Sequence, residues 1–456
     1  MLNVWKNMKE VNKFFKDENP KDNRILTKNV QISLNHRLPN NNMALITPDY
    51  SRRNNTIIFQ NLQQMGSSYV VVDTQGELFR ICAQTLAENG YTVKVLDLIN
   101  LDDSMSYSPF LFMKGEIDVE TYADGFAKCF VSKYKGRFAD PSLPDVACLY
   151  SKILFFSAWY WAKEKQRTAC MKDVAELAHM EREWDENIET GEPITKLSRF
   201  MKKWEEEKKY YSCTSSYNKL KQFAPEITAE ISALFYNMLY ECGAINENSI
   251  FSKNDINIEE LGTGIDGDLN KKMVVFLKVP NVNTMYNWIG SLFLTQCSDV
   301  LMNLSYKHKG KCPVRVEFFL NDMACGCVPI KLERILSLTY RTNISYVLTF
   351  NGIEQLQAMY PDEEWKIIMD NLSIVVYTGV SKDKDTHRYI SSLCGYTVNR
   401  KKTLFHHSTY KEELSVSLDD IQRMPHRAAL ILVRGYIPIY DKHAYDLSMM
   451  YDVKVE

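Results

Sequence analysis

The sequence lacks both a long apolar run and an apolar leader. Its longest apolar stretch, residues 146–162, contains Lys152 and several polar residues, and it falls short of the ~20 apolar residues that a transmembrane helix needs. The segment after Met1 turns polar within a few residues and has no signal-peptide core. We therefore expect a buried helix at 146–162, no integral membrane segment and a cytoplasmic location.

The sequence also lacks an excess of charge of one sign and a paired set of cysteines. Its formal net charge is −2, so bulk electrostatics give no reason to expect non-specific nucleic-acid binding. The eleven cysteines are scattered through apolar segments, which is typical of reduced, buried thiols rather than a disulfide framework. Cys325 and Cys327 form a C-x-C without a second cluster or a nearby histidine, so we expect them to pack rather than bind zinc.

Short β-branched runs bounded by turn residues predict buried parallel strands. They lie at 43–47, 69–72, 92–96, 273–279, 314–320, 345–349, 372–377 and 429–433. Amphipathic helical stretches such as 77–89, 287–306 and 353–359 separate most of them. Alternating strands and helices favour βαβ crossovers, and therefore an α/β fold with a doubly wound sheet.

A region without strand signals interrupts this pattern between about 113 and 246. Its helical stretches are 146–164, 171–184, 195–211 and 227–242. We therefore predict an N-terminal lead-in segment at 1–40 with a helix and a loop, an α/β domain formed by 41–112 and 247–456, and an inserted all-α domain at 113–246.

The loop after the first predicted strand is where a P-loop ATPase holds phosphate. That chemistry needs glycines, so that backbone N–H groups can wrap the phosphates, and a Lys followed by Ser or Thr. The loop here contains no glycine and reads Pro48, Asp49, Tyr50, Ser51, Arg52, Arg53 and Asn54. Pro48 has no N–H to donate, and Asp49 carries the wrong charge. We infer that this is not a working P-loop.

The strand at 314–320 ends in Asn321 and Asp322, where an ATPase would place an Asp for Mg²⁺ and a Glu that activates water. Asn is a weaker Mg²⁺ ligand than a carboxylate, and Asp is one methylene shorter than Glu. Two readings stay open for the pair: a degenerate metal site, or a polar strand end or helix cap.

Several blocks in order along the chain carry a family resemblance. Residues 66–78 end in Asp73-Thr74-Gln75-Gly76-Glu77-Leu78, Tyr107-Ser108-Pro109-Phe110 follows, and 431–435 reads Ile-Leu-Val-Arg-Gly. These are similar to the Asp-Pro-Lys-Gly-Glu-Leu, Tyr-Asn-Pro-Phe and last-strand motifs of the conjugative coupling proteins, the TraG/TraD-like ATPases of type IV secretion. The likeness runs from about 23 to 452 and implies a RecA-like, P-loop NTPase-type parallel sheet with an inserted all-α domain.

The same comparison places the family's catalytic positions on unsuitable residues. Its P-loop Lys and Thr fall on Arg53 and Asn54, its Asp-Glu pair on Asn321 and Asp322, and a nucleotide-sensing Gln on Asn351. The remaining positions are Gln75, where the family has Lys, and Tyr340 and Thr342, where it has an arginine pair, with Arg341 between them. The resemblance therefore implies a degenerate site at which we expect no active catalytic residue and no metal.

Three other segments have both a functional and a structural reading. The aromatic run 155–161 is either a partner-facing patch or, as we expect, helix core. The helix around 199–211 mixes basic and aromatic residues that could grip single-stranded DNA, but its interleaved glutamates favour a solvated face with i,i+4 pairs. His406 and His407 lie beside no Cys or carboxylate cluster, so we expect a surface loop.

Together these observations predict a non-hydrolysing recruitment or adaptor component of conjugative DNA transfer. We expect no cofactor, with Arg53 as the one route to weak ATP binding. The expected partners are conjugation proteins, either the relaxosome or an active coupling-protein paralogue, and single-stranded DNA and an oligomer stay open. No segment matches the family's membrane helices, so any membrane contact would be peripheral, at the inner face and through partners. The alternatives are an active DNA-translocating motor with an atypical P-loop, and a DNA- or protein-binding module outside transfer.

Overall fold

The computed structural model describes residues 4–35, 38–48, 57–137, 140–186, 193–207, 209, 211–246, 249–282, 284–379, 381–402 and 408–445. The strands are β1 Asn23–Ile25, β2 Gln31–Ser33, β3 Met43–Ile46, β4 Ser68–Thr74, β5 Thr92–Asp97, β6 Trp184–Glu186, β7 Pro193–Thr195, β8 Met273–Val279, β9 Val316–Leu320, β10 Ile344–Phe350, β11 Ile374–Tyr377, β12 Tyr396–Lys402, β13 Ser408–Leu414, β14 Ala429–Val433 and β15 Ile439–Asp441. The α-helices are α1 Met8–Phe15, α2 Phe59–Gln63, α3 Glu77–Glu88, α4 Glu116–Lys133, α5 Leu143–Glu164, α6 Met171–Met180, α7 Lys196–Glu206, α8 Ser212–Leu220, α9 Pro225–Glu241, α10 Glu259–Thr263, α11 Asn287–Lys307, α12 Leu332–Ser337, α13 Ile353–Met359, α14 Glu364–Asp370, α15 Lys384–Leu393 and α16 Leu418–Gln422.

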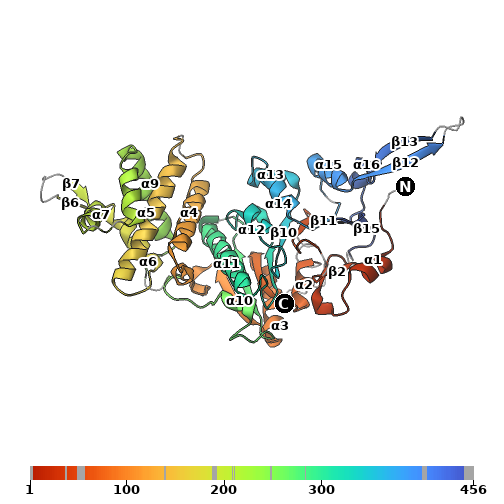
Figure 1. The fold of residues 1–456 in the computed structure, drawn as a ribbon, viewed down its shortest axis with the longest axis horizontal. Coiled ribbons are helices and arrows are strands. Elements are labelled where there is room, and N and C mark those ends of the chain that lie inside the picture. The colour runs from red at the N-terminus through yellow and green to blue at the C-terminus, as the bar shows by residue number, and fades with distance from the viewer. Residues whose placement is uncertain are drawn as a thin grey trace.

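A nine-stranded sheet forms the centre of the molecule, in the order β15-β14-β11-β3-β10-β9-β4-β8-β5 (Figure 1). Every predicted strand is present, and the seven from β11 to β5 in this order run parallel. The prediction of a parallel strand at 429–433 is wrong, because β14 pairs antiparallel with β11 and β15 then pairs antiparallel with β14. A strand buried on both faces reads as a continuous apolar run whatever its direction, so the sequence pattern does not reveal the reversal.

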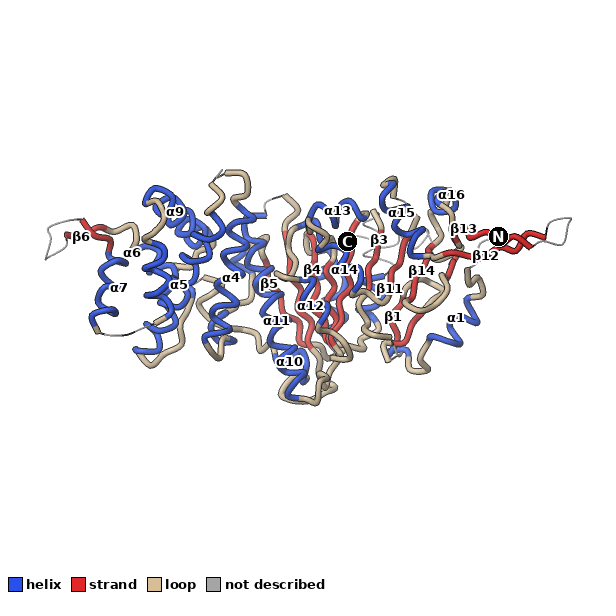
Figure 2. The backbone as a smooth tube through the Cα atoms, turned by 45° about the horizontal axis from the view of Figure 1, so that its top comes forward, coloured by secondary structure: helices blue, strands red, loops and turns tan. Residues whose placement is uncertain are grey.

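Alternate residues of the parallel strands enter two separate hydrophobic cores. In β3, Ala44 and Ile46 join one core, and Met43 and Leu45 join the other. This alternation follows from the two-residue period of a strand, and both faces are buried because helices or loops cover each of them. The outcome is the doubly wound α/β arrangement that the alternation of strands and helices predicted, with helices flanking the sheet in Figure 2.

The helices α4 to α9 lie together at one end of the elongated molecule (Figure 1), beyond the β5 edge of the sheet (Figure 2). The region 113–246 is helical for most of its described length, but the expectation that it is free of strands is wrong. β6 and β7 form a short antiparallel pair, and the helix predicted at 171–184 ends at Met180. An aromatic residue such as Trp184 favours a strand, and Pro193 lacks the N–H that a helix interior requires.

The N-terminal segment is built into the sheet rather than leading up to it. The predicted helix is α1, whose N-cap Asn7 accepts from the N–H groups of Lys9 and Glu10. The antiparallel pair of β1 and β2, which the sequence did not predict, follows it. Trp5 then pairs with the edge strand β15: its N–H donates to the Pro438 carbonyl at 2.7 Å, and its carbonyl accepts from Tyr440 N at 2.9 Å.

Candidate functional site

The ends of β3, β9 and β10, which precede the residues of the expected nucleotide site, lie side by side at the carboxyl edge of the parallel sheet. The β9–β10 and β3–β10 registers place Asn321 beside Thr349, and Thr47 beside Asn351. Thr47 N donates to the Phe350 carbonyl at 3.0 Å, which continues this pairing past the end of β3. Of the loop that follows, exposed Pro48 is described, whereas Asp49, Tyr50, Ser51, Arg52, Arg53 and Asn54 lie outside the described residues.

Asn321 is fully buried, and a neighbouring hydroxyl holds its side chain. Thr349 Oγ1 donates to Asn321 Oδ1 at 3.1 Å and accepts from Asp322 N at 2.7 Å. Asp322 has φ 56°, a left-handed conformation that Asp tolerates better than most residues. It occupies the N-cap position of the short 3₁₀ helix Met323–Cys325, but its side chain makes no capping hydrogen bond. The polar strand end is therefore the better description of this pair.

A row of polar residues crosses the carboxyl edge on one face of the sheet. Continuing the strand registers past the strand ends places Thr349, Asn321 and Asp73 side by side, and Asp73 pairs with Lys278, which pairs in turn with Asp97. Thr349, Asn321, Asp73 and Lys278 each lie two residues after a buried strand residue of one hydrophobic core, and Asp97 lies four residues after Val93, which packs against that core. Because side chains alternate along a strand, all five share that face of the sheet. Lys278 Nζ contacts Asp97 Oδ2 at 2.6 Å, and the cation of the row is thereby paired with a carboxylate. Sequence reasoning missed this row, because it depends on strands far apart in the chain.

Asp73 is a buried carboxylate of this row that accepts hydrogen bonds from backbone N–H groups. It accepts from Leu78 N at 3.0 Å and Phe79 N at 2.7 Å, at the start of α3. Burial raises its pKa to about 6 despite these N–H groups, since desolvation penalises the charged form. Gln75 and Gly76 between strand and helix both have positive φ, and a Cβ on Gly76 would lie 2.6 Å from Lys278 Cε. Glycine at 76 therefore lets Lys278 reach Asp97.

The other aligned positions do not all converge on this edge. Asn351 is exposed, and its N–H donates to Gln355 Oε1 at 2.8 Å at the start of α13. Tyr340, Arg341 and Thr342 precede β10 and therefore lie at the opposite, amino edge of the sheet. There the Arg341 guanidinium lies 4.9 Å from the centre of the Tyr340 ring.

Three further carboxylates follow the ends of β10 and β11, and sequence reasoning did not find them. Oxygen atoms of Glu354, Asp383 and Asp385 lie within 4.8 Å of one another. The Asp383 charge, with burial, raises the pKa of Glu354 above its ordinary value. Asp383 also accepts from the N–H groups of Asp385 and Thr386 as the N-cap of α15, which explains its position without a cation. The group adds negative charge to the carboxyl edge.

The amino edge carries a buried ion pair. Arg24 and Glu317 are both buried and in contact, Arg24 also donates to Ser345 Oγ at 2.9 Å, and Ser67 Oγ donates to Glu317 Oε1 at 2.7 Å. Burial opposes the charge on Glu317, but the Arg24 charge and hydrogen bonds lower its pKa below the ordinary value.

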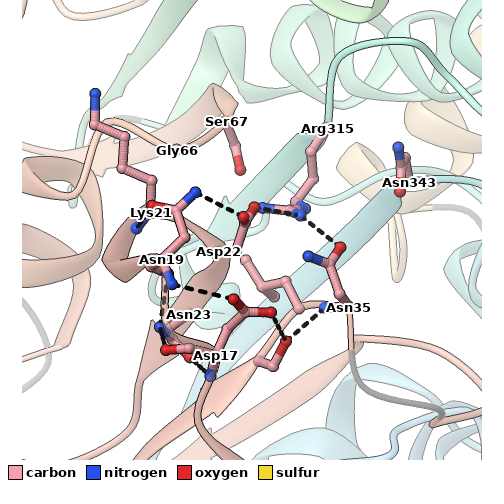
Figure 3. A network of polar contacts seen from close by, with 12 residues as sticks. Asp17, Asn19, Lys21, Asp22, Asn23, Asn35, Gly66, Ser67, Arg315 and Asn343 are labelled. Carbon is pink, nitrogen blue, oxygen red and sulfur yellow. Dashed lines mark hydrogen bonds and ion pairs between the residues drawn. The ribbon is translucent and has the colours of Figure 1, made fainter.

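A second network seals the same edge (Figure 3). Arg315 donates to Asp22 Oδ1 and to Asn35 Oδ1, each at 3.1 Å, and Asn19 donates to Asp22 Oδ2 at 2.8 Å. These contacts hold the N-terminal segment against β9, because Arg315 immediately precedes that strand.

The structural readings of the other candidate segments are confirmed where the structure describes them. Phe155, Phe156 and Tyr160 are buried, so the aromatic run is mainly helix core. In α7, Lys202 pairs with Glu206 and, just beyond it, Lys203 with Glu207, each at 3.9 Å, as expected for a solvated face. Cys325 and Cys327 are both buried free thiols. His406 and His407 lie outside the described residues.

The architecture is thus a RecA-like α/β sheet with helices between β5 and β8, whose carboxyl edge is the expected ligand side. Solved structures share it. The unbound monoclinic form of the bacterial conjugative coupling protein TrwB matches with a TM-score of 0.68 at 12% identity, over 96% of this chain and 92% of that chain. TrwB in complex with the ATP analogue ADPNP gives 0.68 at 12% over 98% and 94%, and VirB4 of Thermoanaerobacter pseudethanolicus gives 0.52 at 10% over 96% and 99%.

The family follows from the sequence match. The model of the family described as "Type IV secretory system Conjugative DNA transfer" matches residues 5–452, and the chain belongs to that family. No curated protein matches the sequence. Among the residues that the structure describes, no helix combines the length and apolar character needed to cross a bilayer.

Proposed function

We propose that this chain is a non-hydrolysing member of the family that acts as a recruitment or adaptor component of conjugative DNA transfer. Asn321 carries the proposal. Hydrolysis needs a carboxylate at the end of this strand to orient Mg²⁺, and Asn321 offers an amide whose oxygen already accepts from Thr349. A buried amide held in this way supports a structural role for the position.

The charges at the carboxyl edge support the same proposal. A nucleotide brings several negative charges, which a working site balances with Lys, Mg²⁺ and backbone N–H groups. Lys278 is paired with Asp97, and Asp322, Glu354 and Asp383 add negative charge. Pro48 contributes no N–H. We therefore propose that the loop from Pro48 to Asn54, together with Asn351, is the remnant of a nucleotide site that no longer hydrolyses ATP.

The runner-up is an ATP-driven DNA-translocating motor with an atypical P-loop. One solved TrwB structure is described as a complex with ADPNP and another as a complex with ADP and Mg²⁺, so that protein binds nucleotide. In this chain, Arg53 is the cation that would meet a phosphate. We therefore propose at best weak ATP binding, with no required cofactor.

Phosphate release by the purified chain, with and without single-stranded DNA, tests the proposal. We expect no turnover above background. Nucleotide affinity measured by calorimetry with Mg²⁺ should be weak and should fall further in Arg53→Ala. DNA-stimulated turnover that Asp322→Asn abolishes would contradict the adaptor role and favour the motor.

Partners and organisation are the remaining parts of the proposal. We propose conjugation proteins as partners, either the relaxosome or an active paralogue, and a peripheral position at the membrane through them. Co-purification from the native host, followed by mass spectrometry, should recover such proteins. Limited proteolysis should release 113–246 as a fragment, because we propose that this span is a domain inserted between 41–112 and 247–456. Cleavage only inside the helical span would contradict that division.

A further inference from the structure

A groove of about 560 Å³ lies between α4 and α5, outside the carboxyl-edge site. Its floor is apolar and includes Ala127, Val131 and Pro144. Its rim is basic and includes Lys128, Lys135 and Lys331. The first two lysines come from α4 and the turn after it, whereas Lys331 comes from the loop that precedes α12.

The fold delivers Lys331 to the helical bundle through close packing at Gly125. A Cβ on Gly125 would lie 3.1 Å from Ile330 Cδ1, so Ile330 reaches the backbone of α4. Ile330 N donates to Thr295 Oγ1 at 2.8 Å, which fixes this loop to α11. Lys331 itself has φ 58°, an uncommon conformation for a residue with a Cβ. The lysine is therefore held at the rim by its neighbours on both sides.

The rim lysines form no ion pairs among the described residues, although the charge of Lys331 acts on the nearby Asp299. Lys152, the half-buried lysine of the groove, forms ion pairs with the two nearest carboxylates: its Nζ lies 2.7 Å from Glu120 and 3.3 Å from Asp124. Lys128, Lys135 and Lys331 are exposed, and in the described parts of the chain none of them has an ion pair within 4.0 Å. The groove thus combines an apolar floor with three available cations.

We propose that this groove docks an acidic amphipathic segment of a partner protein, with apolar side chains on the floor and carboxylates toward the three lysines. The charge is complementary, and apolar anchors inside a polar rim are the usual anatomy of a protein interface. Single-stranded DNA fits less well, because no aromatic ring is among the described lining residues to stack a base, and a sugar-phosphate backbone has no apolar side chains to place on the floor. The inference deepens the proposed recruitment role, and its test does not depend on ATP turnover.

The binding test uses the whole chain and a fluorescein-labelled helix-forming peptide of glutamates with leucines at helical spacing. We expect the triple variant Lys128→Glu, Lys135→Glu, Lys331→Glu to weaken binding by about tenfold or more in fluorescence anisotropy. The matched control reverses the exposed Lys163, Lys219 and Lys253 and should bind as the native chain does. Val131→Ser, which keeps all charges, should weaken binding several-fold if the chain's circular dichroism is unchanged.

Cys148, which lines the groove, reports the location of binding. Bound peptide should slow alkylation of Cys148 by iodoacetamide but leave Cys170, the half-buried N-cap of α6, unaffected. Burial raises the pKa of both thiols, so their slow reaction makes a fair comparison. Equal loss of binding in both charge-reversal variants, equal binding of a peptide without leucines, or binding of oligo-dT in place of the peptide would overturn the proposal. Those results would leave the ATPase test of the adaptor role unaffected.

Discussion

The two edges of the central sheet bury charge in different ways. At the amino edge, Glu317 contacts Arg24, and its pKa lies below the ordinary value. At the carboxyl edge, Asp73 receives two backbone N–H groups, and burial raises its pKa to about 6 despite them and the nearby Lys278 charge. A charge with a dedicated partner strengthens the fold at neutral pH, whereas a charge without one weakens it. The ion pair at the amino edge therefore supports the fold. The carboxyl edge retains a buried carboxylate with a perturbed pKa, which is a feature typical of ligand-binding and catalytic sites.

The largest effect should come from removing the acid of the amino-edge pair. Glu317→Gln leaves the Arg24 guanidinium buried without its counter-charge, which we expect to cost about 3–5 kcal/mol of unfolding free energy in urea titrations. Asp419→Asn is the matched control, because Asp419 and Arg423 form an exposed pair at 3.5 Å, and we expect a change of about 0.5 kcal/mol or less. Equal effects of the two changes would show that the buried pair is not a special feature of this edge.

The next effect tests the close packing at the amino edge. A Cβ on Gly66 would lie 2.0 Å from the carbonyl oxygen of Lys21, so Gly66→Ala must displace the N-terminal segment. We expect a loss of about 1–3 kcal/mol, measured by thermal unfolding. Gly115→Ala is the control, since no atom lies within 4 Å of its added Cβ. If Gly66→Ala is as stable as the control, the close packing of the Lys21 carbonyl against Gly66 does not contribute to stability.

A smaller, pH-dependent effect should appear at the carboxyl edge. Because the folded pKa of Asp73 is raised to about 6 from an ordinary 3.8, the folded state holds a proton that the unfolded state has released between these values. Stability from this group is therefore present at low pH and is lost as the pH rises toward 6, by up to about 3 kcal/mol. Asp73→Asn should remove this part of the pH dependence in urea titrations at pH 4 and pH 7.

Glu317 supplies the opposite sign in the same experiment. Its lowered folded pKa means that its stabilisation is full above its ordinary pKa of 4.5 and is lost only as the pH falls through the folded value. Glu317→Gln should therefore reduce the loss of stability on acidification. A pH profile that both substitutions change in the same direction would contradict the contrast between the edges.

The smallest effect is expected at Asp322. Asn shares with Asp the tolerance for left-handed backbone, so Asp322→Asn should change the unfolding free energy by about 0.5 kcal/mol or less. Asp322→Val is the informative control, because a β-branched residue at φ 56° should cost about 1–2 kcal/mol. A large loss in Asp322→Asn would mean that this carboxylate, like the amide of Asn321, supports the fold directly.

Local sequence patterns predicted the strands but not how they combine. The β-branched run at 273–279 gave β8 with both ends correct, because a strand buried on two faces is a purely local apolar signal. The direction of β14 and the pairing of β6 with β7 depend on which strands meet in space, which periodicity does not report. Asn321 and Asp322 were found by alignment, yet the row that joins Asn321 to Asp73 and Lys278 requires the register between distant strands. Arg24 and Glu317 lie 293 residues apart, so no local pattern pairs them.

The position of β3 in the sheet determines when this strand can pair during synthesis of the chain. β3 lies between β10 and β11, and about 300 residues separate Ile46 from Ile344. At a translation rate of about 5–20 residues per second, β3 would leave the ribosome roughly 15–60 s before either neighbouring strand exists. During that time the apolar residues Met43 to Ile46 have no neighbouring strand with which to pair. The helices from α4 to α9 emerge in the interval and can pack among themselves, so the first strand of the central sheet to be made finds its neighbours only after the whole helical region has been synthesised.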